Sequence, residues 1–292
     1  MARPGALFIA CLFSLAACRG DSAARGSAIA ITDDWGRTVA LAAPATRIVS
    51  LAPATTELVF ALGAGERLVG RTAWCDYPAE AARVTSVGNG IGPNVEAIAG
   101  QRPDLVLLYP SESNRAALGQ LEQLGIAVAV LEQDAIAEWQ RTVRAVGVLV
   151  GREATADSLL ADVNAALAAV RAAPSADSPS VFIAVGANPP IAIGQGSFMA
   201  ELVQLAGGRN AFADIAGPSA PVSLEAIVAR DPAIVLVLGP DSVTGIVARR
   251  PGWPAIRAVR EGRLRAVDGS EYNRPSPRLA AAVQGLKSVL HR

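Results

Sequence analysis

Residues 94–107 read NVEAIAGQRPDLVL, and residues 223–236 read SLEAIVARDPAIVL. Each stretch begins with a helix-capping residue, continues with Glu-Ala-Ile, reaches a proline seven residues after the glutamate and ends in an apolar strand. A second echo pairs Glu57-Leu58-Val59 with Glu201-Leu202-Val203, each ahead of a stop that contains glycine. Because helix, breaker and strand recur in the same order, we interpret the two halves of the chain as copies of one α/β unit.

The first half alternates apolar strands with capped helices. Strands are predicted at 47–51, 67–71, 104–108 and 126–131, and helices at 55–62, 95–100 and 114–124. Thr55 or Thr56 is the expected cap of the first of these helices, and Gly63 is its expected stop. Alternating apolar residues over 29–41, around Asp33-Asp34-Trp35-Gly36, predict a hairpin. Alternation of strand and helix is typical of parallel sheets covered on both faces.

A long helix is predicted over 153–173, where the chain has no glycine or proline and apolar residues recur at spacings of three and four. At about 1.5 Å per residue it spans roughly 30 Å, more than a crossover helix needs. One alternative is an ordinary layer helix on a single large domain. The repeat favours a spacer instead, so the predicted α/β fold has two similar lobes with parallel central sheets, joined by one long backbone helix. The predicted bounds are 29–151 for the first lobe, 152–174 for the helix and 175–292 for the second lobe.

Parallel strands bind ligands outside their carboxyl ends, so two such sheets facing each other predict a ligand cleft between the lobes. The repeat also places Glu96 and Glu225 in equivalent positions, one on each lobe. A pair of like charges related by a pseudo-twofold axis suits docking onto a two-fold symmetric partner. The alternative is that each carboxylate only stabilises the first turn of its helix, where a negative charge interacts favourably with the helix macrodipole.

The first 28 residues are predicted to direct export and anchoring. Arg3 is followed by an apolar run over 6–17, which is too short to span a bilayer and is typical of a signal peptide. The run ends in Leu15-Ala16-Ala17-Cys18, which resembles the bacterial lipobox, whose cysteine is lipidated. We expect a signal peptide over 1–17, lipidation of Cys18 and a polar tether over 18–28. The alternative is an ordinary signal peptide cut near Ala17.

Cysteine use is consistent with this interpretation. The chain has 3 cysteines, and loss of the signal peptide with lipidation of Cys18 leaves Cys75 alone. No disulfide within the mature chain is then expected, although export leads to an oxidising compartment. Cys75 is predicted to be a small buried residue rather than a thiol that contacts ligand.

Charge and histidine content narrow the function. The 26 basic and 26 acidic residues cancel, so the chain lacks the basic field that nucleic-acid binding needs. Its only histidine is His291, which excludes a histidine-based triad or a multi-histidine zinc site. We therefore expect no enzyme, no catalytic residues, no metal site and no cofactor. An exported hydrolase that uses Asp33, Asp34 or Asp76, and a sensor or scaffold, are the weaker alternatives.

Several motifs resemble the substrate-binding proteins of ABC importers for cobalamin, haem and iron siderophores. These are Arg47-Ile48-Val49-Ser50-Leu51-Ala52-Pro53 with Thr56-Glu57, Pro103-Asp104-Leu105-Val106, and Ser276-Pro277-Arg278 ahead of the last helix. Within that family, Cys75-Asp76-Tyr77-Pro78 and Asn188-Pro189-Pro190 followed by Gly194 are most similar to the cobalamin-binding branch. The resemblance covers residue 29 to the C-terminus and implies two α/β lobes on one rigid helix.

The resemblance also implies a site and partners. The implied ligand is cobalamin, and the pocket residues carried over are Ala54, Trp74 and Tyr109 from the first lobe and Ile191, Ser219 and Arg274 from the second. Glu96 and Glu225 would meet arginines of an ABC permease dimer that works with ATPase subunits. The protein would be a monomer, held by its lipid anchor in the cell envelope, facing the periplasm or the outer surface of the plasma membrane.

The pocket departs from the cobalamin branch at Gly90 and Ser219, where that branch can carry tryptophan. Haem is therefore the main alternative ligand, with Tyr77, Tyr109 and Tyr272 as candidate iron ligands. A ferric siderophore is a further alternative, although only Arg274 is then available as a basic residue near the ligand.

Overall fold

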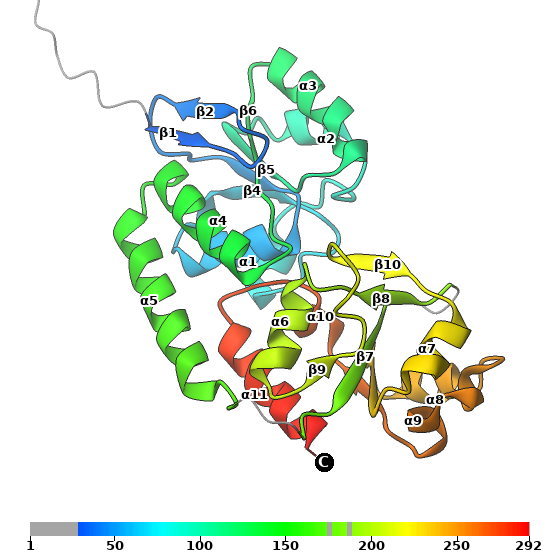
Figure 1. Ribbon diagram of the computed structural model, residues 1–292. Coiled ribbons are helices and arrows are strands. Elements are labelled where there is room, and N and C mark those ends of the chain that lie inside the picture. Colours follow the sequence, from blue (N-terminus) through cyan, green and yellow to red (C-terminus); the bar gives the residue numbers. More distant parts are fainter. Residues whose placement is uncertain (1–28, 174–176, 186–188, 292) are drawn as a thin grey trace, which may run out of the picture.

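The computed structural model describes residues 29–173, 177–185 and 189–291. The predicted signal peptide, the tether and Cys18 lie outside these residues. Two α/β lobes stand side by side, and helix α5 runs along one flank of both (Figure 1). Among the described residues, no helix combines the length and the apolar character needed to cross a bilayer. The predicted two-lobe fold with a single long connecting helix is confirmed.

The first lobe contains a parallel four-stranded sheet in the order β4-β3-β5-β6. Its strands are β3 (Ile48–Ser50), β4 (Leu68–Arg71), β5 (Leu105–Leu108) and β6 (Ala127–Val130). The helices are α1 (Pro53–Ala61), α2 (Val95–Gly100), α3 (Arg115–Gln123) and α4 (Ile136–Leu149), with 3-10 turns η1 (Gly65–Arg67), η2 (Ala79–Arg83) and η3 (Glu112–Asn114). The predicted hairpin is present as the antiparallel pair β1 (Ile29–Thr32) and β2 (Thr38–Leu41).

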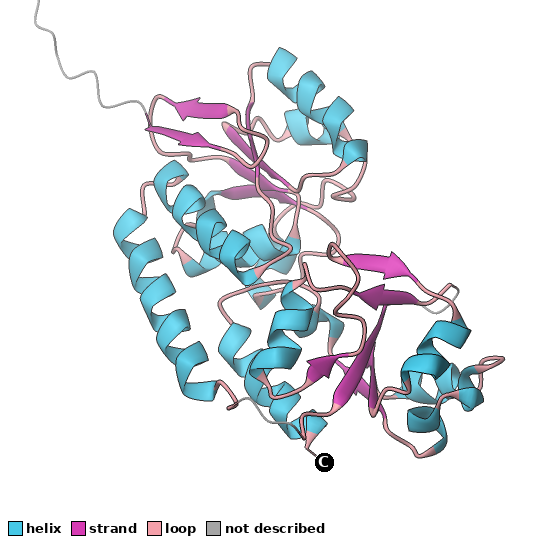
Figure 2. Ribbon diagram, viewed as in Figure 1, coloured by secondary structure: helices cyan, strands magenta, loops and turns pink. Residues whose placement is uncertain are grey.

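The second lobe has a six-stranded sheet in the order β10-β8-β7-β11-β12, with β9 also pairing β7. Its strands are β7 (Ser180–Val185), β8 (Ile191–Ile193), β9 (Arg209–Asn210), β10 (Ser219–Pro221), β11 (Ile234–Leu238) and β12 (Leu264–Val267). The helices are α6 (Phe198–Leu205), α7 (Leu224–Arg230), α8 (Ser242–Ala248), α9 (Arg257–Arg260), α10 (Gly269–Tyr272) and α11 (Leu279–Leu290), with the turn η4 (Trp253–Ala255). Figure 2 shows this sheet between its helices.

The prediction that both sheets are parallel throughout needs a correction in the second lobe. The centre, β7-β11-β12, is parallel, but β8 is antiparallel to β7 and β10 is antiparallel to β8. Only residues 186–190 separate β7 from β8. A parallel crossover needs a dozen or more residues, so such a short link permits only an antiparallel return.

Helix α5 (Glu153–Val170) packs against α4 of the first lobe and α11 of the second. It ends earlier than the predicted range of 152–174. One hydrophobic core contains Trp139 from α4, Leu160 from α5 and Leu286 from α11. The two lobes therefore share buried apolar packing as well as a covalent link, which stiffens the connection between them.

Two local features differ from the sequence-based expectation. Helix α1 begins at Pro53, and its N-cap Ala52 offers no side-chain hydrogen bond. The hydroxyls of Thr55 and Thr56 instead donate to the Ala52 carbonyl. Proline suits the first position of a helix because its missing N–H would lack a partner there in any case. Helix α4 was not predicted, although its buried Ile136, Trp139 and Val143 recur at helical spacing.

The repeat is confirmed in three dimensions. Helix α2 precedes β5 and helix α7 precedes β11, and both helices have a side-chain acceptor at the N-cap. Asn94 accepts a hydrogen bond from the backbone N–H of Ala97, and Ser223 accepts one from that of Ala226. A side-chain acceptor at the N-cap satisfies one of the unpaired N–H groups of the first turn.

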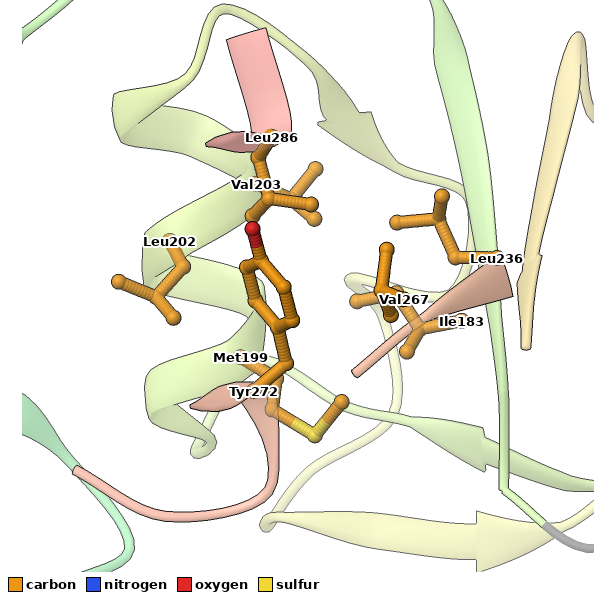
Figure 3. A pocket seen from close by; sticks show the side chains of 8 residues that line it. All are labelled: Ile183, Met199, Leu202, Val203, Leu236, Val267, Tyr272 and Leu286. Carbon is orange, nitrogen blue, oxygen red and sulfur yellow. The ribbon is translucent and has the colours of Figure 1, made fainter. Parts of the chain in front are cut away.

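Tyr272 closes the core of the second lobe beneath α11. Its ring lies among Met199, Leu202, Val203 and Leu286 around a small cavity of about 10 Å³ (Figure 3). Its hydroxyl reaches the backbone of α11, where a Cβ on Gly285 would lie 2.3 Å from the oxygen. A side chain at position 285 and a hydroxyl on residue 272 are therefore incompatible without movement of buried groups.

We expect Gly285→Ala to destabilise the protein by about 1–3 kcal/mol, although alanine favours helices, because the added methyl overpacks the core. Adding Tyr272→Phe should recover most of that loss, since the ring carbon behind the hydroxyl would be 3.6 Å from the new Cβ. Denaturant unfolding of the two single variants and the double variant measures the coupling.

Gly119→Ala in α3 is the matched control, because no atom lies within 4 Å of a Cβ built there. It should gain up to about 1 kcal/mol from helix propensity alone. Equal gains at positions 119 and 285 would contradict the packing argument.

Candidate functional site

A cavity of about 1160 Å³ lies between the two lobes. Its wall in the first lobe consists of residues that follow the carboxyl ends of β3, β4, β5 and β6, together with the 89–91 loop. The second lobe contributes the start of α6 and residues that follow β11 and β12. This is the location expected for a ligand site on open α/β sheets, and here both lobes supply it.

The structure brings four of the six predicted pocket residues together. Ala54, Trp74, Tyr109 and Arg274 all line the cavity. Ile191 and Ser219 do not line it: they lie in the antiparallel strands β8 and β10, where Ser219 pairs with Ile193 and Pro221 pairs with Ile191.

Trp74 stands at the mouth of the cavity on a loop that is anchored from below. Its side chain is 68% exposed, whereas the next residue, Cys75, is fully buried. The hydroxyl oxygens of Thr56 and Thr72 lie 3.0 and 3.1 Å from the Cys75 sulfur. Cys75 thus anchors the loop that carries the exposed indole of Trp74. Its burial agrees with the sequence-based prediction.

The neighbouring loop explains the missing aromatic residue at position 90. A Cβ on Gly90 would lie 2.1 Å from the carbonyl oxygen of Leu51, so no side chain fits there. Ile91 lines the cavity instead and is 71% exposed. The backbone N–H of Ala73 donates to Gly88, which joins this loop to the one that carries Trp74. Two exposed apolar side chains, those of Trp74 and Ile91, therefore line the cavity.

A buried ion pair links the lobes at the edge of the cavity. Glu57 of α1 is only 2% exposed and accepts two hydrogen bonds from Arg278, the N-cap of α11, at 2.9 and 3.2 Å. Burial raises the pKa of Glu57, and Arg278 and Arg274 offset part of that rise. Arg274 lies 3.6 Å from Glu57 and donates to Asp76 at 2.7 Å. Arg274 is thus already paired with acidic side chains before any ligand binds.

Glu201 of the second lobe makes a corresponding contact with the first lobe. It occupies the position in α6 that Glu57 occupies in α1, and it accepts a hydrogen bond from the backbone N–H of Ile136, the first residue of α4, at 3.3 Å. Each glutamate therefore contacts the start of a helix in the opposite lobe. Burial is the main cause that raises the pKa of Glu201, with a smaller contribution from Glu138.

The structure accounts for all 3 tyrosines of the chain. The hydroxyl of Tyr109 donates to Asp134 at 2.7 Å, and burial together with that carboxylate raises its pKa. Tyr77 lies under the guanidinium of Arg278 and is not part of the cavity wall. Tyr272 is enclosed in the second lobe, where burial raises its pKa to about 12. Only Tyr109 faces the cavity, and its hydroxyl is already engaged.

Glu96 and Glu225 are exposed, each in the first turn of its helix. Hydrogen bonds from its own backbone N–H and from Ser223 hold the pKa of Glu225 below its ordinary value. These positions are compatible both with helix stabilisation and with docking.

Several wall residues were not anticipated from the sequence. Gln133 and Asp134 follow β6, Phe198 opens α6, and Asn273 precedes Arg274. The rule that ligand-contacting residues follow strand ends would have found Gln133 and Asp134. Nothing in the local pattern distinguishes Phe198 from an ordinary core residue of an amphipathic helix.

Comparison with known proteins gives consistent matches over most of the chain. The profile of the family described as "Periplasmic binding protein" matches residues 48–270. An ABC transporter substrate-binding lipoprotein of Bacillus subtilis, YvrC, is 32% identical and aligns with 90% of this chain and 85% of its own length. The vitamin B12-binding protein of Vibrio cholerae is 29% identical, with 85% and 90% covered.

Solved structures match as well. The periplasmic haem-binding protein RhuT of a Roseiflexus species has a TM-score of 0.76 and 28% identity, covering 84% of this chain and 97% of that one. The periplasmic vitamin B12-binding protein BtuF of Vibrio cholerae has a TM-score of 0.69 and 27% identity, covering 85% and 97%.

The raised pKa of Glu201 predicts a pH-dependent effect of Glu201→Gln. A carboxyl whose folded-state pKa lies above its unfolded value of 4.5 loses stability as pH rises from that value through the folded-state pKa. Glutamine keeps an acceptor for the Ile136 N–H but cannot ionise. The variant should therefore be more stable than the wild type at pH 8, by less than about 1 kcal/mol because the group is only partly buried, and equally stable near pH 4.

Denaturant midpoints at the two pH values provide the measurement, with Glu153→Gln in the exposed first turn of α5 as the control. A gain of the same size at both pH values would show that ionisation of Glu201 is not its cause.

Proposed function

This chain belongs to the periplasmic binding protein family, and we propose that within this family it captures cobalamin or a related corrinoid and delivers it to an ABC permease. Members of the family are substrate-binding transport proteins and not enzymes. The observation that carries the proposal is the cavity of about 1160 Å³ between the lobes. Ordinary small-molecule pockets occupy roughly 300–1,000 Å³, so this one suits a macrocycle.

The chemistry of the wall supports a corrinoid over the two alternatives. The described lining residues include two carboxylates, Asp76 and Asp134, and one guanidinium, Arg274, which Asp76 already holds. Haem carries two propionates and many ferric siderophores are anionic, so both would place negative charge beside these carboxylates. A corrin carries amide side chains and avoids that repulsion.

Iron ligation is a second argument against haem. Protein ligands to haem iron are usually His, Cys, Met or Tyr. Tyr109 is the one tyrosine in the wall, and its hydroxyl is bonded to Asp134 in a setting that raises its pKa. His291 lies beside Ala206 at the end of α11, in the second lobe. By contrast, the flat indole of Trp74 suits the face of a corrin, and Ile91 adds a second exposed apolar side chain.

We also propose that Cys18 carries a lipid that holds the mature chain at the membrane surface. The Leu15-Ala16-Ala17-Cys18 sequence and the lipoprotein designation of YvrC support this. The mature protein would then face the periplasm or the outer surface of the plasma membrane as a monomer, with the cleft free to receive ligand.

Isothermal titration tests the ligand. Cyanocobalamin should bind the purified mature chain in about a one-to-one ratio, and Trp74→Ala should weaken binding roughly tenfold or more, because a large exposed ring at the mouth is lost. Leu124→Ala, which removes another exposed apolar side chain outside the cavity wall, is the control and should leave binding unchanged. If cyanocobalamin gives no heat of binding and haemin binds clearly, the ligand is haem and the cobalamin proposal is wrong.

We further propose that Glu96 and Glu225 dock the loaded protein onto a permease dimer. They are exposed, carry the same charge, and occupy equivalent positions on the two lobes at α2 and α7. Two arginine-bearing sites on a two-fold symmetric partner would complement them.

Charge reversal of both residues, Glu96→Lys with Glu225→Lys, should leave cyanocobalamin affinity intact and reduce uptake by more than about tenfold, because buried interfacial charge pairs are lost. Uptake of labelled cyanocobalamin in cells that rely on this protein is the measurement. Glu112→Lys with Glu153→Lys, which reverses two other exposed carboxylates in first turns, is the control. Normal uptake by the first double variant would reject the docking proposal.

A further inference from the structure

One segment of the second lobe carries a concentrated positive charge. Residues 242–267 contain six arginines and a single acidic residue, Glu261, in a chain whose positive and negative charges otherwise balance. The rest of the chain therefore has an excess of negative charge. The segment covers α8, η4, α9 and β12. Figure 1 shows α8 and α9 at the end of the second lobe that is far from the first lobe.

A hydrophobic core holds this segment together. Val247 of α8, Trp253 of η4 and Ala258 of α9 are buried in one cluster. The ring of Trp253 packs against that of Phe182 in β7, with the ring centroids 6.4 Å apart. Helices α8 and α9 both contact η4. These elements therefore form one packed unit on the sheet, and the arginines extend from a fixed backbone.

Most of the positive charge in this segment is not compensated. Arg257 and Arg263 form ion pairs with Asp231 and Glu261. The other four have no ion pair among the described residues: Arg249, Arg250, Arg260 and Arg265. Two of these, Arg260 and Arg265, donate only to backbone carbonyls. A guanidinium has five N–H donors, so each keeps donors for an anionic partner.

An exposed isoleucine lies beside these charges. Ile246 of α8 is 53% exposed. Arg249, the C-cap of α8, and Arg250 follow it at spacings of three and four, which bring side chains to the same side of a helix. The guanidinium of Arg249 lies back along the helix, 3.6 Å from where a Cβ on Gly245 would be. We call Ile246 and the four unpaired arginines the basic face.

The chemistry of the basic face favours an anionic bilayer over other partners. Guanidiniums bind lipid phosphates, and an apolar side chain among them can enter the headgroup region. A stable protein interface needs a larger apolar centre, but Ile246 is the only exposed large apolar side chain of residues 242–267. Trp253, the only aromatic residue there, is buried, so no ring is available to stack on nucleic-acid bases.

Part of the basic face lies at the opposite end of the sheet from the ligand cleft. The cavity is lined by residues at the carboxyl ends of β11 and β12, such as Gly239 and Gly269. Arg260 belongs to α9, which precedes the amino end of β12. Contact through this end of the lobe therefore leaves the mouth of the cleft free to receive ligand.

From these observations we propose that the basic face binds the anionic phospholipid surface of the membrane at which the chain is held. A chain anchored through Cys18 is already close to that surface, so even a weak attraction is enough to hold the second lobe against it. The proposal does not depend on which ligand the cleft binds.

Vesicle flotation tests the proposal on the mature chain carrying Cys18→Ser, so that no lipid anchor contributes. This chain should bind vesicles of phosphatidylcholine and phosphatidylglycerol in equal parts at least about tenfold more tightly than vesicles of phosphatidylcholine alone. Because the attraction is between exposed charges, added salt should weaken the binding.

Two variants locate the binding on the basic face. Arg249→Gln with Arg250→Gln should weaken binding to the anionic vesicles about tenfold or more, because each basic residue at such a surface contributes about a factor of five. Neither side chain has a hydrogen bond or ion pair among the described residues, so the melting temperature should not change. Ile246→Ser should also weaken binding, because it removes the apolar contact.

The first lobe offers matched controls. Arg83→Gln with Arg144→Gln changes two exposed arginines that also have no ion pair among the described residues. Leu124→Ser changes an apolar side chain that is 58% exposed. Both control variants should bind the anionic vesicles as the parent chain does.

Equal binding to the two kinds of vesicle, or binding to neither, would overturn the proposal. Equal losses in the two arginine variants would also overturn it, because they would indicate a general effect of charge. Soluble glycerol phosphate should not displace the chain, since displacement would indicate a small phosphate site instead of a membrane surface. Cyanocobalamin affinity should be the same in all these variants, so failure of this proposal and failure of the ligand proposal are distinguishable.

Discussion

The junction between the lobes depends on how the buried carboxylate of Glu57 is paired across it. Removing one partner of a buried ion pair typically costs about 3–5 kcal/mol, so Glu57 requires Arg278. That requirement fixes the start of the last helix against the first helix. Glu201 makes the matching contact to the start of α4. The duplicated chain thus places one glutamate of each lobe in contact with the other lobe.

This constraint explains the composition of the cleft. Because the lobes are joined at α1, α6 and the helices they contact, the carboxyl ends of both sheets face one cavity. The wall residues at the carboxyl ends of six strands of the two sheets include apolar ones, such as Leu51 and Leu238, as well as polar ones, such as Asp134. Arg274 belongs to the junction and to the wall at once, since it contacts Glu57 and Asp76.

The local elements were largely predictable, and their errors have identifiable causes. Periodicity and punctuation located the strands of the first lobe within a residue or two, because burial on both faces leaves continuous apolar runs. The start of α1 was misplaced because two threonines outweighed Pro53 in the capping argument, although proline is a good first residue. The direction of β8 depended on the length of its link to β7, which a general α/β pattern does not weigh.

The sequence by itself determined the duplication, the connecting helix, the equivalence of Glu96 and Glu225, and a family resemblance that placed Ala54, Trp74, Tyr109 and Arg274 at the site. Only the tertiary structure decided that Gln133 Oε1 has no hydrogen-bond partner among the described residues, that Gly90 excludes a side chain, and that Glu57 faces Arg278. The physical reason is the separation along the chain of the groups that interact. Periodicity and capping record what a residue needs from its near neighbours, whereas pairing and steric exclusion depend on groups that folding brings together from distant parts of the chain.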